Sequence, residues 1–154
     1  MSQAAANLRS EYGQKLYDGL DALPSSKRLT SEQLEVIYSL AYAHVVQQQY
    51  AQALPIFTFL AQYGPTRKHY LTGLALSLRK VGRFDEAINM YSLVLVLFPD
   101  SLEAALHIAE CQIGQNELGQ ARISLSQLVE ATEDDPDLQT RARSLLELLS
   151  RGAA

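Results

Sequence analysis

The segments Tyr50-Ala51-Gln52-Ala53, Phe84-Asp85-Glu86-Ala87 and Leu118-Gly119-Gln120-Ala121 decide the fold of this 154-residue chain. They follow one another at a constant spacing of 34 residues, and in each a large side chain is followed three positions later by alanine. Four residues beyond each alanine stands another large side chain, at Phe57, Tyr91 and Leu125. A fixed period of this length indicates a tandem repeat in which each unit is one supersecondary element.

The same period continues upstream of each segment. Small residues recur at Ala41, Ala75 and Ala109, and an aliphatic residue directly precedes each of them, at Leu40, Leu74 and Ile108. Small and large residues at set offsets over 34 positions are typical of the tetratricopeptide helix-turn-helix repeat. We therefore expect an all-α solenoid in which the alanines lie where paired helices approach closely and the larger residues fill the layers between helices.

The ends of the repeat helices are predicted from periodicity and turn residues. Thr30 and Gln33 have the spacing of a capping box, so the first repeat helix should begin near Ser31. Thr66 should cap the helix that follows Gly64-Pro65, and Asp100 and Glu103 should form a second capping box after Pro99. The expected helices span residues 31–47, 50–62, 67–80, 84–97, 101–114 and 117–131.

Two further helices flank the repeats. Apolar residues recur at a helical interval over residues 7–22, after a segment 1–6 that we expect to be frayed. A helix over 136–150 follows the acidic residues 133–135 and has an apolar side, as expected of a helix that caps a repeat array. The expected domain plan is an N-terminal arm (1–29), three repeats (about 34–67, 68–101 and 102–135), the capping helix and a tail (151–154).

Composition excludes several classes of function. The net charge of −4 argues against nucleic acid as a partner, because phosphate binding needs clustered Lys and Arg. No apolar run approaches the ~20 residues that cross a bilayer, so neither membrane insertion nor a secretion signal is expected. The single cysteine, Cys111, excludes an internal disulfide and fits a reducing compartment. We expect a cytosolic protein.

The inner surface of the solenoid has an unusual composition. In such arrays the first helix of each pair lines the concave side. The expected inward residues are Glu35, Tyr38, Tyr42 and Val45, then His69, Thr72, Leu76 and Arg79, then Glu103, Leu106, Glu110 and Ile113. Tyrosines and aliphatic residues on a surface that would otherwise be polar predict a groove that buries apolar side chains. The alternative is that the N-terminal segment or a second copy of the chain covers this surface.

The sequence offers no catalytic or metal-binding pattern. His44, His69 and His107 fall on different predicted helices without a neighbouring Cys or His at metal-ligand spacing. Cys111 lies among core positions, which favours a buried, inert thiol over a nucleophile. Phosphate-binding loops, nucleophile elbows and His-Glu metalloprotease motifs are absent from the sequence. We therefore expect neither an enzyme nor a bound cofactor.

Beyond the repeat pattern, the sequence resembles the class II chaperones of bacterial type III secretion, which hold hydrophobic translocator proteins. The resemblance covers roughly residues 30 to 150. It is carried by LEVIYSLAY at 34–42, FTFL at 57–60 and VGRFDEAI at 81–88, and most specifically by His107-Ile108-Ala109-Glu110-Cys111. Where the family usually has a Gly-Gly-Thr type turn, residues 20–26 here read LDALPSS.

The resemblance implies a function, partners and a site. It implies an ATP-independent chaperone whose concave groove binds an extended N-terminal translocator segment with a Pro-x-Leu-x-x-Pro-like pattern, keeping the translocator soluble until export. As in some relatives, a homodimer through the N-terminal helix is also implied. The expected peptide-binding residues, from the family's groove positions and the inward positions together, are Tyr38, Tyr42, Val45, Tyr50, Tyr63, His69, Tyr70, Thr72, Leu76, Arg79, Tyr91, Leu106, His107 and Glu110.

Two other binding functions are compatible with a tetratricopeptide array. An adaptor that docks a C-terminal peptide carboxylate needs Lys, Arg and Asn converging in the groove, whereas Tyr38, Tyr42, Glu103 and His107 occupy those positions here. A chaperone of the needle subunit of the same secretion system is disfavoured by the chain length and by the expected capping helices.

Overall fold

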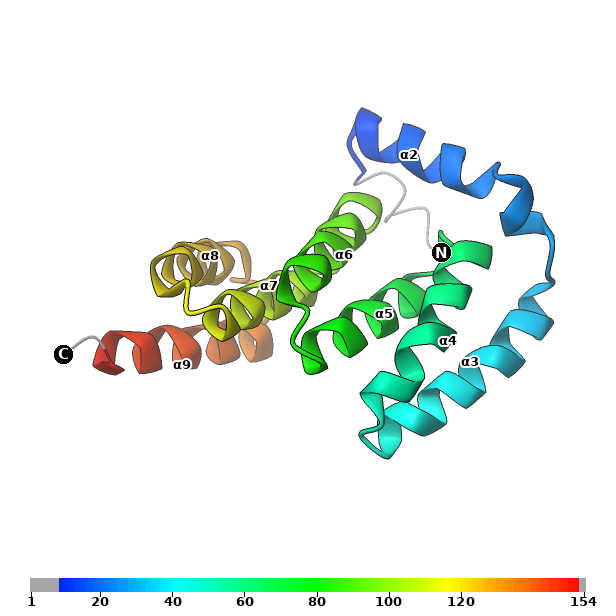
Figure 1. Cartoon of the computed structure of the whole chain (residues 1–154). Coiled ribbons are helices and arrows are strands. Elements are labelled where there is room, and N and C mark those ends of the chain that lie inside the picture. The colour runs from blue at the N-terminus through cyan, green and yellow to red at the C-terminus, as the bar shows by residue number, and fades with distance from the viewer. Residues whose placement is uncertain (1–8, 153–154) are drawn as a thin grey trace.

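A computed structural model describes residues 9–152 of the chain, and every regular element in that range is a helix (Figure 1). The expected fold class is confirmed by this helical architecture together with its repeat period. The helices are α2 (Glu11–Asp21), the short 3₁₀ helix η1 (Pro24–Lys27), α3 (Ser31–Val46), α4 (Tyr50–Tyr63), α5 (Lys68–Lys80), α6 (Phe84–Leu97), α7 (Glu103–Gly114), α8 (Leu118–Ala131) and α9 (Pro136–Gly152).

Each repeat helix packs against the next one along the chain, from α3 through to α9. In Figure 1 the pairs α3–α4, α5–α6 and α7–α8 follow one another, and α9 closes the C-terminal end. The repeat helices therefore begin and end within two residues of the expected positions. The helix predicted over 7–22 is shorter in the described range, and the segment 1–6 and residues 7, 8, 153 and 154 lie outside it.

The repeated alanines lie where helices approach closely, as expected. All six are fully buried: Ala41, Ala53, Ala75, Ala87, Ala109 and Ala121. Phe57, Tyr91 and Leu125 are buried beside them. Gly73 shows how tight this packing is, because a Cβ placed on it would lie 2.1 Å from Cε1 of Phe57. The core is divided into a larger cluster built mainly from α3 to α6 and a smaller one that joins α7, α8 and α9.

Leu40 is not part of the core, which corrects the prediction made from its offset. Its side chain is 56% exposed, whereas Leu74, at the same offset in the second repeat, is buried. The difference follows from position in the array, because α3 begins the stack of pairs and has no preceding pair to cover its outer side. Repeat arrays normally place polar residues on such a terminal face.

The caps predicted from sequence divide into confirmed and wrong ones. Thr30 and Gln33 form the expected capping box at α3. Asp135, which was not predicted as a cap, accepts a hydrogen bond from the Leu138 N–H in front of Pro136. Thr66 does not cap α5; its hydroxyl donates to Asp21 instead, 3.4 Å away. Asp100 and Glu103 form no capping box, because the chain makes a further turn through Ser101 and Leu102 and α7 begins only at Glu103.

The N-terminal helix α2 packs on α6 rather than on α3. Gly13 allows this contact, since a Cβ there would lie 2.7 Å from the Val96 carbonyl oxygen. Arg9 donates to the Leu97 carbonyl and lies over the Tyr17 ring, and Tyr17 packs edge-on against Phe98. Figure 1 shows α2 reaching across the molecule from the end of α6 towards the start of α3. The described part of the N-terminal arm therefore does not fill the inner surface.

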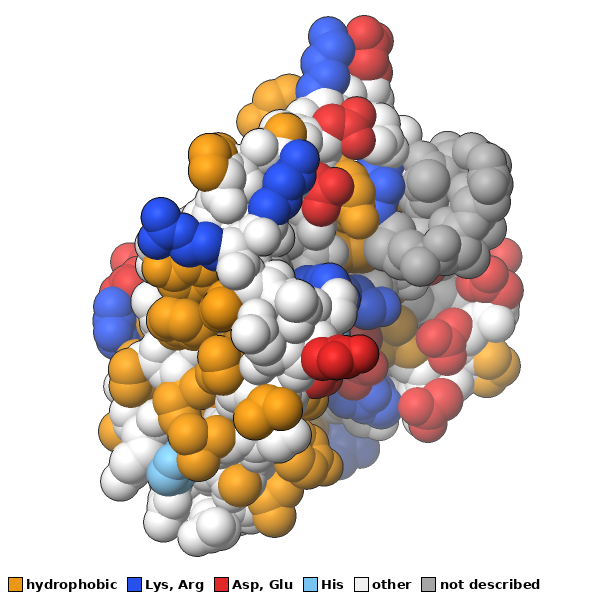
Figure 2. Space-filling model, turned by 90° about the vertical axis from the view of Figure 1, so that its right-hand side faces the viewer, with side chains coloured by type: hydrophobic (Ala, Val, Ile, Leu, Met, Phe, Trp, Pro, Cys, Tyr) orange, Lys and Arg blue, Asp and Glu red, His pale blue; other side chains and the backbone are white. Residues whose placement is uncertain are grey.

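Two surface properties follow from this arrangement. Within residues 9–152, no helix combines the length and the apolar composition that crossing a membrane requires. The face made by α3 and α4 exposes Val36, Leu40, Val46 and Phe59. Figure 2 shows hydrophobic side chains gathered in the lower left part of the view onto this side of the molecule. We call this surface the α3–α4 end face.

Candidate peptide-binding groove

A groove of about 760 Å³ lies along the inner side of the helix stack. Residues of α3, α5, α7 and α9 line it, together with parts of α4 and α6 and the segments before α7 and α9. Eight of the fourteen residues expected to bind peptide lie around it, namely Tyr38, Tyr42, Val45, His69, Thr72, Leu76, Tyr91 and His107. The first helix of each pair thus contributes to one continuous surface.

One side of the groove is an aromatic wall, which we define as Tyr38, Tyr42 and His69. The Tyr38 ring centroid lies 6.1 Å from that of Tyr42 and 4.8 Å from that of His69, in an edge-to-face arrangement with the imidazole. Tyr42 is exposed, whereas Tyr38 and His69 are half-buried. Burial, with the nearby carboxylate of Glu35, raises the pKa of Tyr38, so its hydroxyl stays neutral. The wall offers broad apolar contact with few rotors to order.

Tyr91 and His107 form the floor of the groove. Their rings are stacked, with centroids 5.2 Å apart and 30° between the planes. Tyr91 is almost wholly buried, and that burial raises its pKa to about 12. The repeat period requires a large side chain at this position, so Tyr91 is mainly a core residue. Only a small part of its surface faces the groove.

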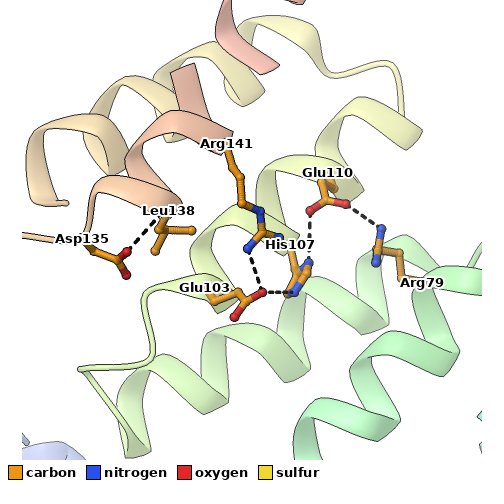
Figure 3. Close-up of polar contacts among 7 residues, drawn as sticks. All are labelled: Arg79, Glu103, His107, Glu110, Asp135, Leu138 and Arg141. Carbon is orange, nitrogen blue, oxygen red and sulfur yellow. Dashed lines mark hydrogen bonds and ion pairs between the residues drawn. The ribbon is translucent and has the colours of Figure 1, made fainter. Parts of the chain in front are cut away.

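A chain of alternating basic and acidic side chains crosses the C-terminal half of the groove (Figure 3). Arg79 of α5 donates to Glu110 at 2.9 Å, and Nδ1 of His107 lies 3.1 Å from the other oxygen of Glu110. Nε2 of His107 lies 3.8 Å from Glu103, which accepts from Arg141 of α9 at 3.1 Å. We call these five residues the charge ladder. It joins α5, α7 and α9, so three successive layers of the stack are connected on the groove side.

The ladder also determines the ionisation of its central carboxylate. The hydrogen bond from His107 lowers the pKa of Glu110, and partial burial opposes this, while the nearby charge of Arg79 lowers it further. Glu110 therefore remains a carboxylate well below neutral pH. The two arginines of the ladder are already paired, so they are poor candidates for holding the terminal carboxylate of a peptide.

Six of the expected peptide-binding residues lie away from the groove lining. Tyr70 and Leu106 are buried between helices, so they cannot contact a peptide in this conformation. Arg79 and Glu110 belong to the charge ladder. Tyr50 lies at the start of α4 near Lys80, and Tyr63 packs on Phe59 at its end.

The position of Leu106 has a specific cause. It shares an offset with Tyr38 and Thr72, which both line the groove. In the third repeat, however, α9 packs against this position, and Leu106 joins a core cluster with Leu138 and Ala142. The capping helix therefore replaces the surface that a simple repeat would have left open.

Several lining residues were not predicted from the sequence. Phe57 and Val94 come from the second helices of their pairs, and Gly73 lies where the Phe57 ring comes close. The segment before α7 and the α8–α9 junction contribute acidic groups, and α9 contributes Leu138 and Arg141. An apolar face on the predicted capping helix was the only sequence signal for that last contribution.

Two features bear on metal and thiol chemistry in the part of the chain that the structure describes. No group of His, Cys, Asp and Glu among these residues is arranged to hold a metal ion. Cys111 is buried as expected, and burial raises the pKa of its thiol to about 11. The arrangement is suited to binding a chain segment by shape and apolar contact.

Comparison with known proteins agrees with the fold. Two tetratricopeptide repeat family models match residues 38–88 and 78–148. A curated relative, the low calcium response locus protein H of Yersinia pseudotuberculosis, is 29% identical over 124 residues, which is 79% of this chain and 74% of that protein.

Solved structures extend the comparison. The Yersinia enterocolitica type III secretion chaperone SycD in complex with a peptide of the translocator YopD is 27% identical, with a TM-score of 0.73 over 83% of this chain and all of that one. An alternative dimer of SycD is 27% identical, with a TM-score of 0.74 over 82% of this chain and 98% of that one.

The fold and the groove define a tetratricopeptide-repeat protein. The likeness to these relatives supports the resemblance to the class II type III secretion chaperones that the sequence indicates.

Proposed function

We propose that this protein is a chaperone that binds an extended N-terminal segment of a hydrophobic translocator in the groove described above. The observation that carries the proposal is a continuous groove with apolar and aromatic side chains from the first two repeats. The related SycD has been solved with a peptide of the translocator YopD. The function is binding, and the translocator is kept soluble and ready for export.

The chemistry of the groove favours an extended apolar segment. Leu76 and Val45 line the groove beside the aromatic wall, so alternate side chains of a bound strand would meet apolar surface. A Pro-x-Leu-x-x-Pro-like pattern suits this surface, because proline preorganises an extended chain and lowers the cost of ordering it. The paired charges of the ladder leave the arginines little capacity to select an acidic ligand.

The protein works in the cytosol without turnover under this proposal. A carboxylate-clamp adaptor is disfavoured further, because Lys68 donates to Ser101 and Arg141 to Glu103 rather than both converging on one point. A needle-subunit chaperone is distinguished by whether the co-purified partner is a small helical protein or a large membrane-active one.

The protein also forms a homodimer under this proposal, through the α3–α4 end face. Residues 36–66 contain no Asp, Glu, Lys or Arg, so two copies of this face can meet without burying a charge. The resemblance implies a dimer contact through the N-terminal helix, and this stays a second prediction, because α2 packs on its own α6 with one side while Tyr12 on it is 71% exposed. A dimer has been solved for the related SycD.

The proposal is tested with a fluorescein-labelled synthetic peptide that carries the Pro-x-Leu-x-x-Pro pattern, by fluorescence anisotropy. We expect a Kd of roughly micromolar or tighter, about 8 kcal/mol of binding free energy. Tyr38→Ala and Leu76→Glu should each weaken binding at least about tenfold. Tyr12→Ala is the matched control, since Tyr12 is 71% exposed on α2 and lies outside the groove. Unchanged binding by both groove variants would refute the groove assignment.

A further inference from the structure

Glu35 contacts the aromatic wall through His69 without lining the groove itself. It lies on the first turns of α3, one helical turn before Tyr38. One of its carboxylate oxygens, Oε1, accepts a hydrogen bond from the Tyr70 hydroxyl at 2.8 Å and lies 2.6 Å from Nε2 of His69. A single oxygen of α3 therefore holds two neighbouring rings of α5.

The rings of His69 and Tyr70 both pack against the ring of Tyr38. The Tyr38 centroid lies 4.8 Å from that of His69 and 5.7 Å from that of Tyr70. His69 and Tyr70 also lie against each other, with centroids 4.2 Å apart. The position of the Tyr38 ring in the groove thus depends on where His69 and Tyr70 are held.

The ionisation of these groups agrees with the geometry. Partial burial opposes the charge of Glu35, yet the hydrogen bonds from His69 and Tyr70 hold the pKa of its carboxyl below the usual value. Burial raises the pKa of Tyr70 well above its ordinary value, and the hydrogen bond to Glu35 raises it further. At neutral pH the carboxylate accepts and the phenol donates. Tyr70 is fully buried, so without Glu35 its hydroxyl would lose this acceptor.

We propose that Glu35 is a positioning residue of the groove: by holding His69 and Tyr70 it fixes the Tyr38 ring in the orientation that receives an apolar side chain of the ligand. This inference rests on the proposed function and adds a residue that controls the affinity of the groove for the peptide. A wall that is ordered before binding spares the complex the cost of ordering it. Without the carboxylate, His69 and Tyr38 would have to be ordered when the peptide binds.

The test compares three substitutions with the same labelled peptide. Glu35→Ala removes both contacts, so Tyr38 and His69 must be ordered when the peptide binds, and binding should weaken about tenfold. Glu35→Gln keeps an acceptor oxygen of the same shape and should stay within about threefold of the parent protein. Glu32→Ala is the matched control, one turn earlier on the same helix and exposed, and should not change binding.

A second readout separates positioning from general loss of structure. In the free protein, ring protons of Tyr38 and His69 should give a nuclear Overhauser contact in the parent and in Glu35→Gln, and lose it in Glu35→Ala. The double variant Glu35→Ala with Tyr70→Phe removes the stranded hydroxyl and should fold normally, yet bind as weakly as Glu35→Ala. This variant keeps the test decisive if Glu35→Ala alone folds poorly.

The outcomes are distinguishable. If the parent protein binds the peptide and the double variant binds equally well, the positioning role is wrong while the proposed function stands. If Glu35→Gln is as weak as Glu35→Ala despite normal folding, the role assigned to the acceptor oxygen is wrong. If the parent itself does not bind, the proposed function fails and this inference fails with it.

Discussion

The imidazole of His107 is stacked on the ring of Tyr91, with centroids 5.2 Å apart and 30° between their planes. The contact joins the second helix of one repeat to the first helix of the next. It also joins a core residue to a member of the charge ladder, because His107 lies between Glu103 and Glu110. The floor of the groove is therefore part of the packing that holds the repeats together.

Removing the Tyr91 ring should destabilise the whole array. We expect Tyr91→Ala to lower the free energy of unfolding by about 3–5 kcal/mol, as for other large buried aromatic residues. Tyr91→Phe keeps the ring and its stacking on His107, so it should cost far less. Urea denaturation followed by circular dichroism measures both. Equal losses for the two variants would show that the hydroxyl, rather than the ring, is what matters.

Gly73 should tolerate no side chain. A Cβ there would lie 2.1 Å from the Phe57 ring, so Gly73→Ala must displace that ring from the core. We expect a loss of about 1–3 kcal/mol in unfolding free energy, typical of overpacking.

The matched control for Gly73 is Gly119→Ala in α8. A Cβ at Gly119 would meet nothing within 4 Å, so this substitution should stabilise the protein by about 0.5–1 kcal/mol. Thermal melting of both variants provides the measurement. A stable Gly73→Ala protein would mean that α4 and α5 lie further apart than described.

The charge ladder should make stability depend on pH. The folded-state pKa of Glu110 is lowered, so its contribution is present above the unfolded pKa and is lost as the pH falls through the folded pKa. We expect the parent protein to be more stable than Glu110→Gln at neutral pH, with the difference shrinking as the solution is acidified below about pH 4. Melting temperatures across that range measure it. A difference that is constant with pH would contradict this assignment.

Cys111 should react slowly with a thiol reagent. Burial raises its pKa to about 11, so both access and thiolate content are low. Because the chain has a single cysteine, the rate of reaction with Ellman's reagent reports on this site alone. We expect slow labelling in buffer and rapid labelling in denaturant. Rapid labelling of the native protein would contradict the burial described for α7.

The α3–α4 end face should control the oligomeric state. Leu40→Glu places a charge in the middle of this uncharged surface, so we expect it to convert a dimer into a monomer in light scattering after size exclusion. Ile123→Glu is the control, since Ile123 is 54% exposed on α8, far along the array. If the Leu40→Glu protein remains a dimer and the Ile123→Glu protein becomes a monomer, the dimer contact lies near α8 and not on the α3–α4 end face.

The repeat architecture could be predicted from the sequence because it depends on local spacing. The alanine positions and the capping box at Thr30 follow from contacts within one helix pair, which recur every 34 residues. The prediction that Leu40 is a core residue was wrong, because it depends on a contact outside its own helix pair. Its burial requires a preceding pair, and the period cannot show where an array begins.

The groove was predicted less completely because its lining depends on how distant segments pack. Tyr38 and Leu76 follow from helical offsets and His107 from the family resemblance, and the structure brings them to one surface. Leu106 shares the offset of Tyr38 but is covered by α9. The repeat pattern does not predict that α9 packs on the groove side. Glu35 was expected to face inward, yet its contact with Tyr70 could not be seen without coordinates.

The most direct test of the central claim is a titration of isotope-labelled protein with the Pro-x-Leu-x-x-Pro peptide, followed by nuclear magnetic resonance. We expect the resonances of Tyr38, Leu76 and His107 to shift together and saturate with one affinity, while those of Tyr12 and Ile123 stay unchanged. Shifts confined to the α3–α4 end face, with the groove resonances unmoved, would contradict it.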